Sequence, residues 1–159
     1  MASPETLLRE AGLRVTRPRV AVLTALAGAP HSGADAVLSA VRRESDVSTQ
    51  AVYDVLNVLT AHRVLRRIQP AGSVARYELR IGDNHHHLVC RTCGSVSDVD
   101  CATGEAPCLT PDPQTRAPGF VVDEAEVTYW GVCEACRSIP DPGGTSSHAV
   151  PTNQRRDHA

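Results

Sequence analysis

No stretch of this 159-residue sequence stays apolar for long enough to cross a membrane. Residues 1–13 also lack the positively charged segment followed by an apolar core that marks a secretory signal. We therefore expect a cytoplasmic protein with no membrane partner. In such a reducing compartment, the six cysteines favour thiolate–metal chemistry over disulfide bonds.

Lysine is absent, so all 16 basic side chains are arginines. Residues 1–80 carry 11 arginines and 7 carboxylates, whereas residues 81–159 carry 5 arginines and 11 carboxylates. The net charge of −2 therefore combines a basic front half with an acidic back half. A basic front half is typical of a segment that contacts a polyanion.

The sequence has no glycine-rich loop that would cradle phosphates, and no serine–histidine–aspartate order within a hydrolase motif. Internal repeats are missing as well. The length is sufficient for one domain or two small ones. The chemistry of this chain must therefore be sought in its cysteines and histidines.

Two Cys-x-x-Cys pairs, Cys90 with Cys93 and Cys133 with Cys136, supply four thiolates. Four thiolates complete the tetrahedral coordination of a zinc ion, which is the closed arrangement of a structural site. The span between the pairs is longer than in common zinc ribbons and leaves room for strands. The alternative interpretation is a set of redox dithiols or disulfides.

Three consecutive histidines lie just upstream of the first pair. In an extended strand, the side chains of His85 and His87 point to one face and that of His86 to the other. Two imidazoles on one face are the start of a second metal site with nitrogen and oxygen ligands. The alternative interpretation is a solvated polar strand.

The front half reads as helices followed by two strands. Apolar spacing and capping residues predict helices over residues 4–12, 16–28, 32–44 and from 48 to at least 59. In the third of these, Ser32 and Asp35 have the spacing of a capping box. Residues 64–69 and 74–79 are rich in strand formers around a turn. This order predicts the winged form of the helix-turn-helix.

The fourth helix carries an apolar stripe and a separate polar face. Gln50, Tyr53, Asp54 and Asn57 line that face, which suits the reading of base edges in a major groove. The alternative is an ordinary polar helix face. Arginines on the flanking parts would contact phosphates without reading sequence. They are Arg14, Arg17, Arg19, Arg66, Arg67 and Arg76.

The back half begins after a predicted hinge at residues 81–84. Strands are expected at the histidines, at residues 96–99 and within 120–130, whereas residues 101–118 read as a loop. Residues 138–159 hold almost no apolar side chain and are predicted to be disordered.

Several motifs together resemble the ferric uptake regulator family, in its order and over nearly all of residues 5–137. They are Arg14-Val15-Thr16-Arg17-Pro18-Arg19, His31-Ser32-Gly33-Ala34-Asp35, Gln50-Ala51-Val52-Tyr53-Asp54-Val55-Leu56, the histidine run and the two cysteine pairs. Residues 99–109 resemble more narrowly the actinobacterial FurA-type branch. That branch is associated with redox-responsive control of catalase or catalase-peroxidase genes.

The resemblance implies an α+β protein with an N-terminal winged-helix DNA-binding domain (1–80), a hinge (81–84), a C-terminal α/β metal-binding dimerisation domain (85–137) and a tail (138–159). It also implies a homodimer that represses promoters at an A·T-rich inverted repeat in double-stranded DNA. The resemblance places structural zinc on Cys90, Cys93, Cys133 and Cys136. It places the regulatory ligands, which suit Fe(II), Mn(II) or Zn(II), on His31, Glu78, His85, His87 and Asp98. The expected DNA contacts are Arg14, Arg17, Arg19, Gln50, Tyr53, Asn57 and Arg76.

The sequence departs from the family pattern at a few positions. Asn84 and Ala125 replace histidines of a third family metal site, which is therefore expected to be absent or altered. Asp54 stands where an arginine commonly follows the tyrosine. Asp98, in place of glutamate, resembles the peroxide-sensing members. Cys101 and Cys108 lie outside the zinc set, as small buried residues or as an extra redox pair.

The leading hypothesis is a metal-dependent, redox- or peroxide-responsive repressor that is not an enzyme. A regulator of iron or zinc homeostasis without redox sensing is the nearest alternative. A zinc-stabilised DNA-binding module without sensing is another. A metallohydrolase is a distant alternative, because catalytic zinc keeps an open position that five protein ligands would fill.

Overall fold

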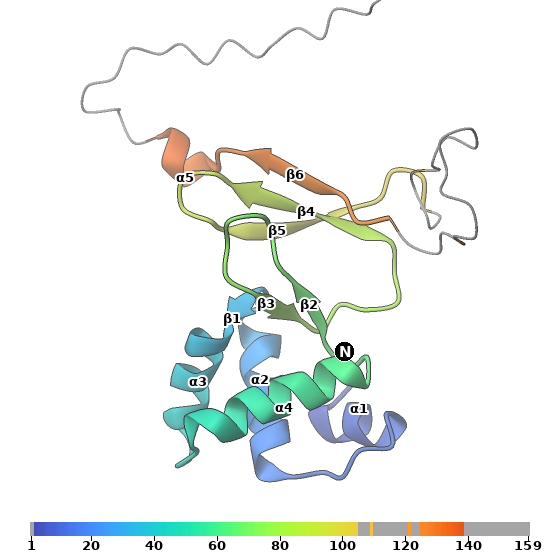
Figure 1. Cartoon of the computed structure of the whole chain (residues 1–159), viewed down its shortest axis with the longest axis vertical. Helices are drawn as coiled ribbons and strands as arrows, with labels where there is room; N and C mark the ends of the chain where they lie inside the picture. Colours follow the sequence, from blue (N-terminus) through green and yellow to red (C-terminus); the bar gives the residue numbers. More distant parts are fainter. Residues whose placement is uncertain (1, 105–108, 110–120, 122–124, 139–159) are drawn as a thin grey trace, which may run out of the picture.

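The computed structural model describes residues 2–104, 109, 121 and 125–138 (Figure 1). The N-terminal half (residues 2–80) contains α1 (Pro4–Glu10), α2 (Arg17–Gly28), β1 (Ser32–Gly33), α3 (Ala34–Arg42), α4 (Thr49–Ala61), β2 (Arg66–Ile68) and β3 (Arg76–Glu78). The C-terminal half (residues 85–138) contains β4 (His85–Cys90), β5 (Val96–Asp100), β6 (Thr128–Gly131) and α5 (Glu134–Arg137). The predicted tail lies outside the described residues, apart from Ser138.

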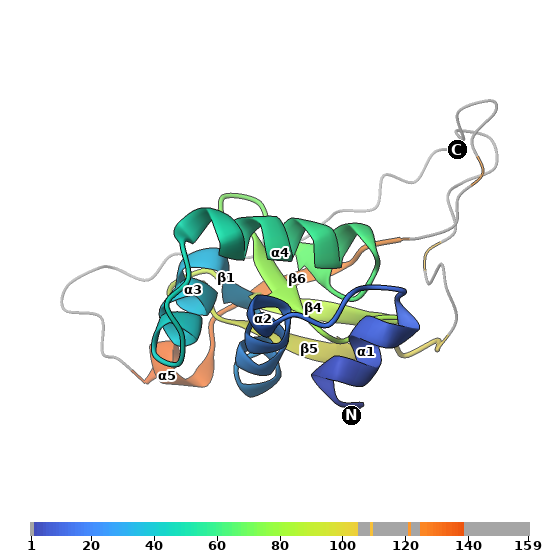
Figure 2. The ribbon, with the colours of Figure 1, turned by 90° about the horizontal axis from the view of Figure 1, so that it is seen from below.

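The elements form layers along the long axis of the molecule. In Figure 1 the four helices lie at the bottom, the sheet β1-β3-β2 lies above them, and the sheet β5-β4-β6 with α5 lies at the top. Seen from below, in Figure 2, α1 to α4 lie in front of the strands. Helices followed by a small antiparallel sheet make the N-terminal half a winged helix, as predicted. No helix of the described residues is both long and apolar enough to traverse a bilayer.

The core of the N-terminal half is built from the apolar stripes of the helices. Leu8 of α1, Leu23 of α2 and Leu56 of α4 are fully buried, and Val37 of α3 is nearly so. Tyr77 of β3 packs into the same cluster. Burial of a large aliphatic side chain contributes about 1.5–3 kcal/mol, so these stripes fix how the helices pack.

Side-chain capping hydrogen bonds mark the starts of α1 and α4, whereas Thr16, at the N-cap position of α2, makes none. Ser3 and Ser48 accept hydrogen bonds from backbone N–H groups of α1 and α4, as N-cap residues do. The capping box predicted at Ser32 is wrong. Its hydroxyl donates to the Ala29 carbonyl (2.7 Å), and α3 begins two residues later, at Ala34. Ser32 instead lies in β1, a two-residue strand paired with β3 that was not predicted.

The central wing strand, β3, faces two ways. Tyr77 packs into the helical core, so its neighbours Arg76 and Glu78 lie on the opposite face, toward the C-terminal half. Glu78 is 1% exposed, although it is charged. One strand therefore joins the hydrophobic core to a polar interface.

The C-terminal sheet sets the register of the histidines. β4 pairs antiparallel with β5, which places His87 opposite Asp98, and parallel with β6, which places His87 opposite Thr128. The rings of His85 and His87 lie 5.0 Å apart, whereas the ring of His86 lies 6.1 Å from that of Tyr129. The alternation predicted for the three histidines is thus confirmed.

The helical core yields a first prediction. Leu56→Ala removes a fully buried side chain from α4 and should lower the free energy of unfolding by about 2–5 kcal/mol. Guanidinium titration of zinc-saturated protein, followed by helical circular dichroism, measures this. Val74 is 69% exposed, so Val74→Ala should change the same quantity by less than about 0.5 kcal/mol. Equal losses in the two variants would contradict this packing.

Candidate metal centres

The four paired cysteines, which we call the cysteine centre, converge from both ends of the C-terminal half. Their sulfur atoms all lie within 4.8 Å of one another. The Sγ atoms of Cys93 and Cys133 are 3.7 Å apart. A disulfide would hold them at about 2.05 Å, whereas two sulfurs on tetrahedral zinc, each at about 2.3 Å from the metal, lie about 3.8 Å apart. The geometry therefore fits zinc and not a disulfide.

Backbone N–H groups favour the charged, metal-binding form of one of these thiols, that of Cys90. The Cys133 N–H donates to Cys90 Sγ at 3.4 Å. This bond and the Cys93 N–H lower the pKa of Cys90 to about 5, so that its thiolate forms at neutral pH. The neighbouring Cys133 and Cys93 raise the pKa of Cys136 to about 12. Four thiolates in this space need a divalent cation to balance their charge.

A second group, the histidine cluster, lies between the two halves. It comprises His31 and Glu78 from the N-terminal half and His87 and Asp98 from the C-terminal half, with ligand atoms within 4.8 Å of one another. His31 Nε2 lies 2.9 Å from Glu78 Oε2 and 2.7 Å from Asp98 Oδ1. His87 Nε2 lies 3.2 Å from the same Glu78 oxygen. Residues distant in sequence thus meet at one point.

His85 borders this cluster. Its Nε2 lies 3.2 Å from Glu78 Oε1 and 3.9 Å from Asp98 Oδ1. All five residues that the family resemblance nominated for a regulatory metal are therefore neighbours. Of the described residues, only the cysteine centre and the four-residue cluster bring three or more such side chains within this distance.

The electrostatics of the cluster suit a divalent cation. Burial would raise the pKa of Glu78, but hydrogen bonds with His31 and His87 lower it to about 2. Glu78 in turn raises the pKa of His31, against the effect of burial. Asp98 Oδ1 is buried and lies 2.7 Å from His31 Nε2 and 3.6 Å from His87 Nε2. Carboxylate oxygens and imidazole nitrogens that converge on one point fit Fe(II), Mn(II) or Zn(II).

Further residues orient the ligands. Asp83 Oδ1 lies 2.7 Å from His85 Nδ1, the outer carboxylate–histidine contact that commonly fixes a metal-binding imidazole. Arg80 binds Asp83 and Asp100, each at 2.5 Å, and lies 3.7 Å from Asp98. The sequence reasoning missed Arg80 and Asp83. Their positions in the sequence could have indicated them, because Arg80 lies two residues after Glu78 and Asp83 lies two residues before His85.

His31 occupies a demanding backbone conformation. Its φ of 59° lies in the left-handed region, which costs a non-glycine residue about 1–3 kcal/mol. Such a conformation persists where the surrounding structure holds it. The surrounding contacts therefore hold His31 where its imidazole reaches the cluster.

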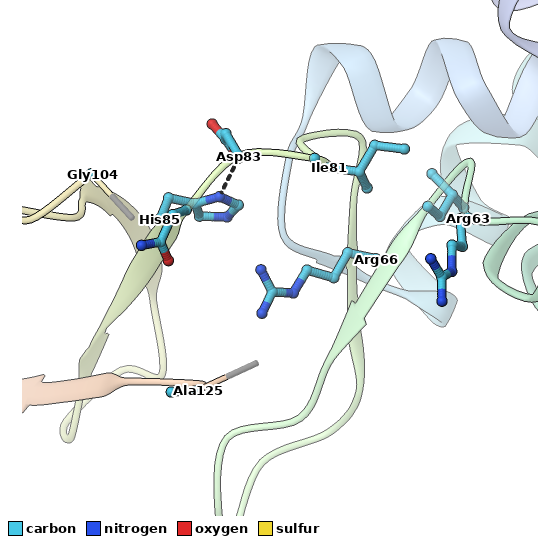
Figure 3. A pocket seen from close by; sticks show the side chains of 10 residues that line it. Arg63, Arg66, Ile81, Asp83, His85, Gly104 and Ala125 are labelled. Atoms are coloured by element: carbon cyan, nitrogen blue, oxygen red, sulfur yellow. Dashed lines mark hydrogen bonds and ion pairs between the residues drawn. The ribbon is translucent and has the colours of Figure 1, made fainter. Parts of the chain in front are cut away.

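A cleft of about 730 Å³ lies at the hinge, beside the cluster. Figure 3 shows Arg63 and Arg66 on the side of the N-terminal half, with His85, Gly104 and Ala125 across from them. The dashed line marks the contact of Asp83 with His85. The sequence patterns did not predict a cleft. Asn84 and Ala125 both line it and bring neither an imidazole nor a carboxylate.

Most of the residues nominated for DNA contact lie on α4 or near the start of α2. Gln50, Tyr53 and Asn57 lie on the exposed face of α4, opposite its buried stripe. Arg14 and Arg17 are exposed near the start of α2, and the half-buried Arg19 donates to the Arg14 carbonyl at 2.8 Å.

Arg76 differs from the prediction. Because Tyr77 fills the core, Arg76 faces the C-terminal half, where its Nη1 and Nη2 donate to the carbonyls of His31 and Gly94. Its guanidinium is committed within the protein, which argues against the phosphate contact that the sequence suggested.

The carboxylates of Asp54 and Asp35 accept hydrogen bonds from two side chains on the polar face of α4. Gln50 Nε2 donates to Asp54 Oδ1 at 2.7 Å, and the Tyr53 hydroxyl donates to Asp35 Oδ1 at 3.3 Å. The charge of Asp35 raises the pKa of Tyr53, so this phenol remains a hydrogen-bond donor at neutral pH. Asp54 thus has a partner within α4.

Of the two cysteines outside the cysteine centre, the structure describes Cys101. Cys101 is half-buried, and its bond with Thr103 Oγ1 (3.1 Å) lowers its pKa to about 6. Cys108 lies outside the described residues. Cys101 is not among the four sulfurs of the cysteine centre.

Removing one thiolate tests the cysteine centre. Cys133→Ser should reduce the zinc content of purified protein from one ion per chain to nearly none and lower the melting temperature, because three ligands hold zinc poorly and the knuckles part. Elemental analysis and calorimetry measure both. Cys101→Ser is the matched control and should keep its zinc. Retention of zinc by Cys133→Ser would refute the four-thiolate site.

Comparisons with known proteins agree with this geometry. Residues 10–107 match the model of the ferric uptake regulator family. Transcriptional regulator FurA of Mycobacterium tuberculosis is 62% identical over 135 residues, covering 84% of this chain and 89% of the relative. Ferric uptake regulation protein 1 of Mycolicibacterium fortuitum is 58% identical over 134 residues, covering 84% of this chain and 81% of the relative.

Solved structures show the same architecture. The ferric uptake regulator from Pseudomonas aeruginosa with manganese matches with a TM-score of 0.63 and 30% identity, over 84% of this chain and 99% of that chain. The one from Francisella tularensis with iron matches with a TM-score of 0.64 and 25% identity, over 79% and 96%. The predicted α+β class and the resemblance to FurA-type proteins are confirmed. The chain therefore belongs to the ferric uptake regulator family of transcriptional regulators.

Proposed function

We propose that this protein is a metal-dependent repressor that binds operator DNA as a homodimer. The observation that carries the proposal is the origin of the histidine cluster. His31 and Glu78 come from the winged helix, whereas His87 and Asp98 come from the C-terminal sheet. A cation bound by both halves stabilises the state in which they are joined. That state sets the distance between the two recognition helices of the dimer.

The two centres differ in ligand chemistry, and we propose a separate task for each. Thiolate ligands suit a permanent structural zinc. Imidazole and carboxylate ligands suit a regulatory Fe(II), Mn(II) or Zn(II). The iron and manganese carried by the Francisella and Pseudomonas regulators support this assignment. His31, Glu78, His85, His87 and Asp98 would hold the regulatory ion.

We assign DNA reading to the exposed face of α4. Gln50, Tyr53 and Asn57 would meet base edges in the major groove, and Arg14, Arg17 and Arg19 would contact phosphates. Two such helices on a two-fold axis match an inverted repeat with half-sites about 34–36 Å apart, or a multiple of that distance. From the family resemblance we expect this repeat to be A·T-rich.

We further propose that oxidant releases the repressor, which suits control of catalase or catalase-peroxidase genes. Oxidation of a metal-bound imidazole or of a thiolate would weaken metal binding and so lower DNA affinity. The 62% identity to FurA and the carboxylate of Asp98 support this finer assignment. A homeostasis regulator would instead respond to metal concentration and keep its DNA affinity in peroxide.

The test is binding to an operator selected from random duplexes, with zinc-loaded protein in chelated buffer and with added Mn(II) or Fe(II). We expect added metal to tighten specific binding, and peroxide to reverse this in the iron-loaded protein. Equal binding with and without metal would show a zinc-stabilised DNA-binding module without sensing.

A catalytic role has weaker support. The cleft at the hinge offers space for a substrate. Of the five nominated metal ligands, however, His85 alone is among the residues that line it. A catalytic metal keeps an open position and a nearby base, whereas here the nominated ligands surround one point. The relatives are named as transcriptional regulators. We propose no reaction for this site.

Loss of one regulatory ligand should weaken binding of the regulatory metal and leave the structural zinc in place. His87→Ala should weaken Mn(II) binding by more than about 100-fold, beyond the usual loss from an outer contact, and reduce operator affinity to its metal-free value. Zinc content should remain one ion per chain. His62→Ala changes an exposed histidine beyond α4 and is the control. If His87→Ala retains metal-stimulated binding, the cluster is not the regulatory site.

The polar face of α4 gives a matching prediction for DNA. Tyr53→Ala should cost about 1–3 kcal/mol of discrimination between operator and shuffled duplex, the usual value of a good base contact. Fluorescence anisotropy at fixed salt measures both affinities. Arg9→Ala, on the exposed face of α1, should leave this difference unchanged. Equal losses on both duplexes in Tyr53→Ala would show a phosphate contact instead.

A further inference from the structure

The guanidinium of Arg76 forms hydrogen bonds to two loops simultaneously, one in each half of the molecule. Its Nη1 donates to the carbonyl of His31 at 3.1 Å, and its Nη2 donates to the carbonyl of Gly94 at 2.7 Å. The two bonds span 45 and 18 residues of sequence. The planar guanidinium fork suits two acceptors held in fixed directions.

The Gly94 end of this bridge belongs to the first cysteine knuckle. Gly94 directly follows Cys93, and its N–H donates to the Cys90 carbonyl at 2.9 Å. Its φ of 70° is one that glycine adopts readily, and an added Cβ would lie 3.5 Å from Arg76 Nη2. The position of this carbonyl is therefore set by the turn that carries two thiol ligands.

The His31 end belongs to the histidine cluster. The carbonyl of His31 accepts from Arg76 while its imidazole lies 2.7 Å from Asp98. Because this residue is held at positive φ, the bond to its carbonyl helps to fix where the imidazole points. Arg76 Nε is buried without a hydrogen-bond partner, as expected if the two Nη bonds decide where the side chain lies.

We infer that Arg76 is a positioning residue that couples the cysteine centre to the histidine cluster. It transmits the order of the zinc knuckle to His31 and so raises the affinity of the cluster for its cation. The inference rests on the proposed regulatory metal. It gives a physical route by which disorder at the thiols, including that caused by oxidation, weakens a site that contains no thiol.

The experiment is a titration of zinc-loaded protein with Co(II), whose visible absorption reports nitrogen and oxygen coordination and whose weaker affinity leaves zinc in place. Arg76→Met fills the same space without donors and should bind Co(II) about 10–100-fold more weakly, the range for lost outer contacts. Arg76→Lys, with one ammonium for two carbonyls, should recover only part of this. Arg67→Met, an exposed arginine of the same hairpin, should bind like the wild type.

A second measurement separates coupling from general damage. Gly94→Ala should also weaken Co(II) binding, although Gly94 contributes no ligand, and should add no further loss when combined with Arg76→Met. Zinc content and melting temperature are recorded for every variant. Unchanged Co(II) affinity in Arg76→Met, or independent losses in the double variant, would overturn the coupling. Failure of the wild type to bind Co(II) beyond its zinc would instead overturn the proposed regulatory site.

Discussion

The buried carboxylate of Glu78 is the interaction on which the arrangement of the two halves depends. A charge that is 1% exposed is strongly unfavourable unless it is paired. Its partners are His31 from a loop of the winged helix and His85 and His87 from the C-terminal sheet. The N-terminal half therefore satisfies its own buried charge by docking against the other half. A cation at the same point would strengthen that union.

Strand β3 links this polar contact to the core that packs α4, the helix that we propose reads DNA. Tyr77 anchors the strand in the core that also packs α4, while Glu78 and Arg76 reach the other way. A change at the cluster therefore acts on a rigid body rather than on a loose loop. In the proposed mechanism, ligands drawn from both halves would allow one ion to bias the position of the whole helix α4.

The two centres differ in ligand chemistry, which is the basis of the separate tasks that we propose for them. Thiolates bind zinc tightly and permanently, and the N–H groups that reach Cys90 favour its charged form. Imidazoles and carboxylates exchange their metal more readily and so suit sensing. Their proximity along one short strand is informative, because β4 begins at His85 and ends at Cys90. A single strand thus carries ligands of both kinds, and its register with β5 and β6 orders both centres.

The sequence by itself determined the helices, the winged fold, the four-thiolate set and the two faces of the histidine strand. Each follows from local spacing. Resemblance, and not spacing, nominated His31, Glu78 and Asp98.

Only the tertiary structure decided that these residues meet, that the two-residue strand β1 completes the wing, and that Arg76 turns inward. The physical reason is that each depends on contacts between segments remote in sequence. The partner of a buried charge and the face taken by a short strand are set by the segments that pack against them. Local sequence propensity does not encode those long-range contacts.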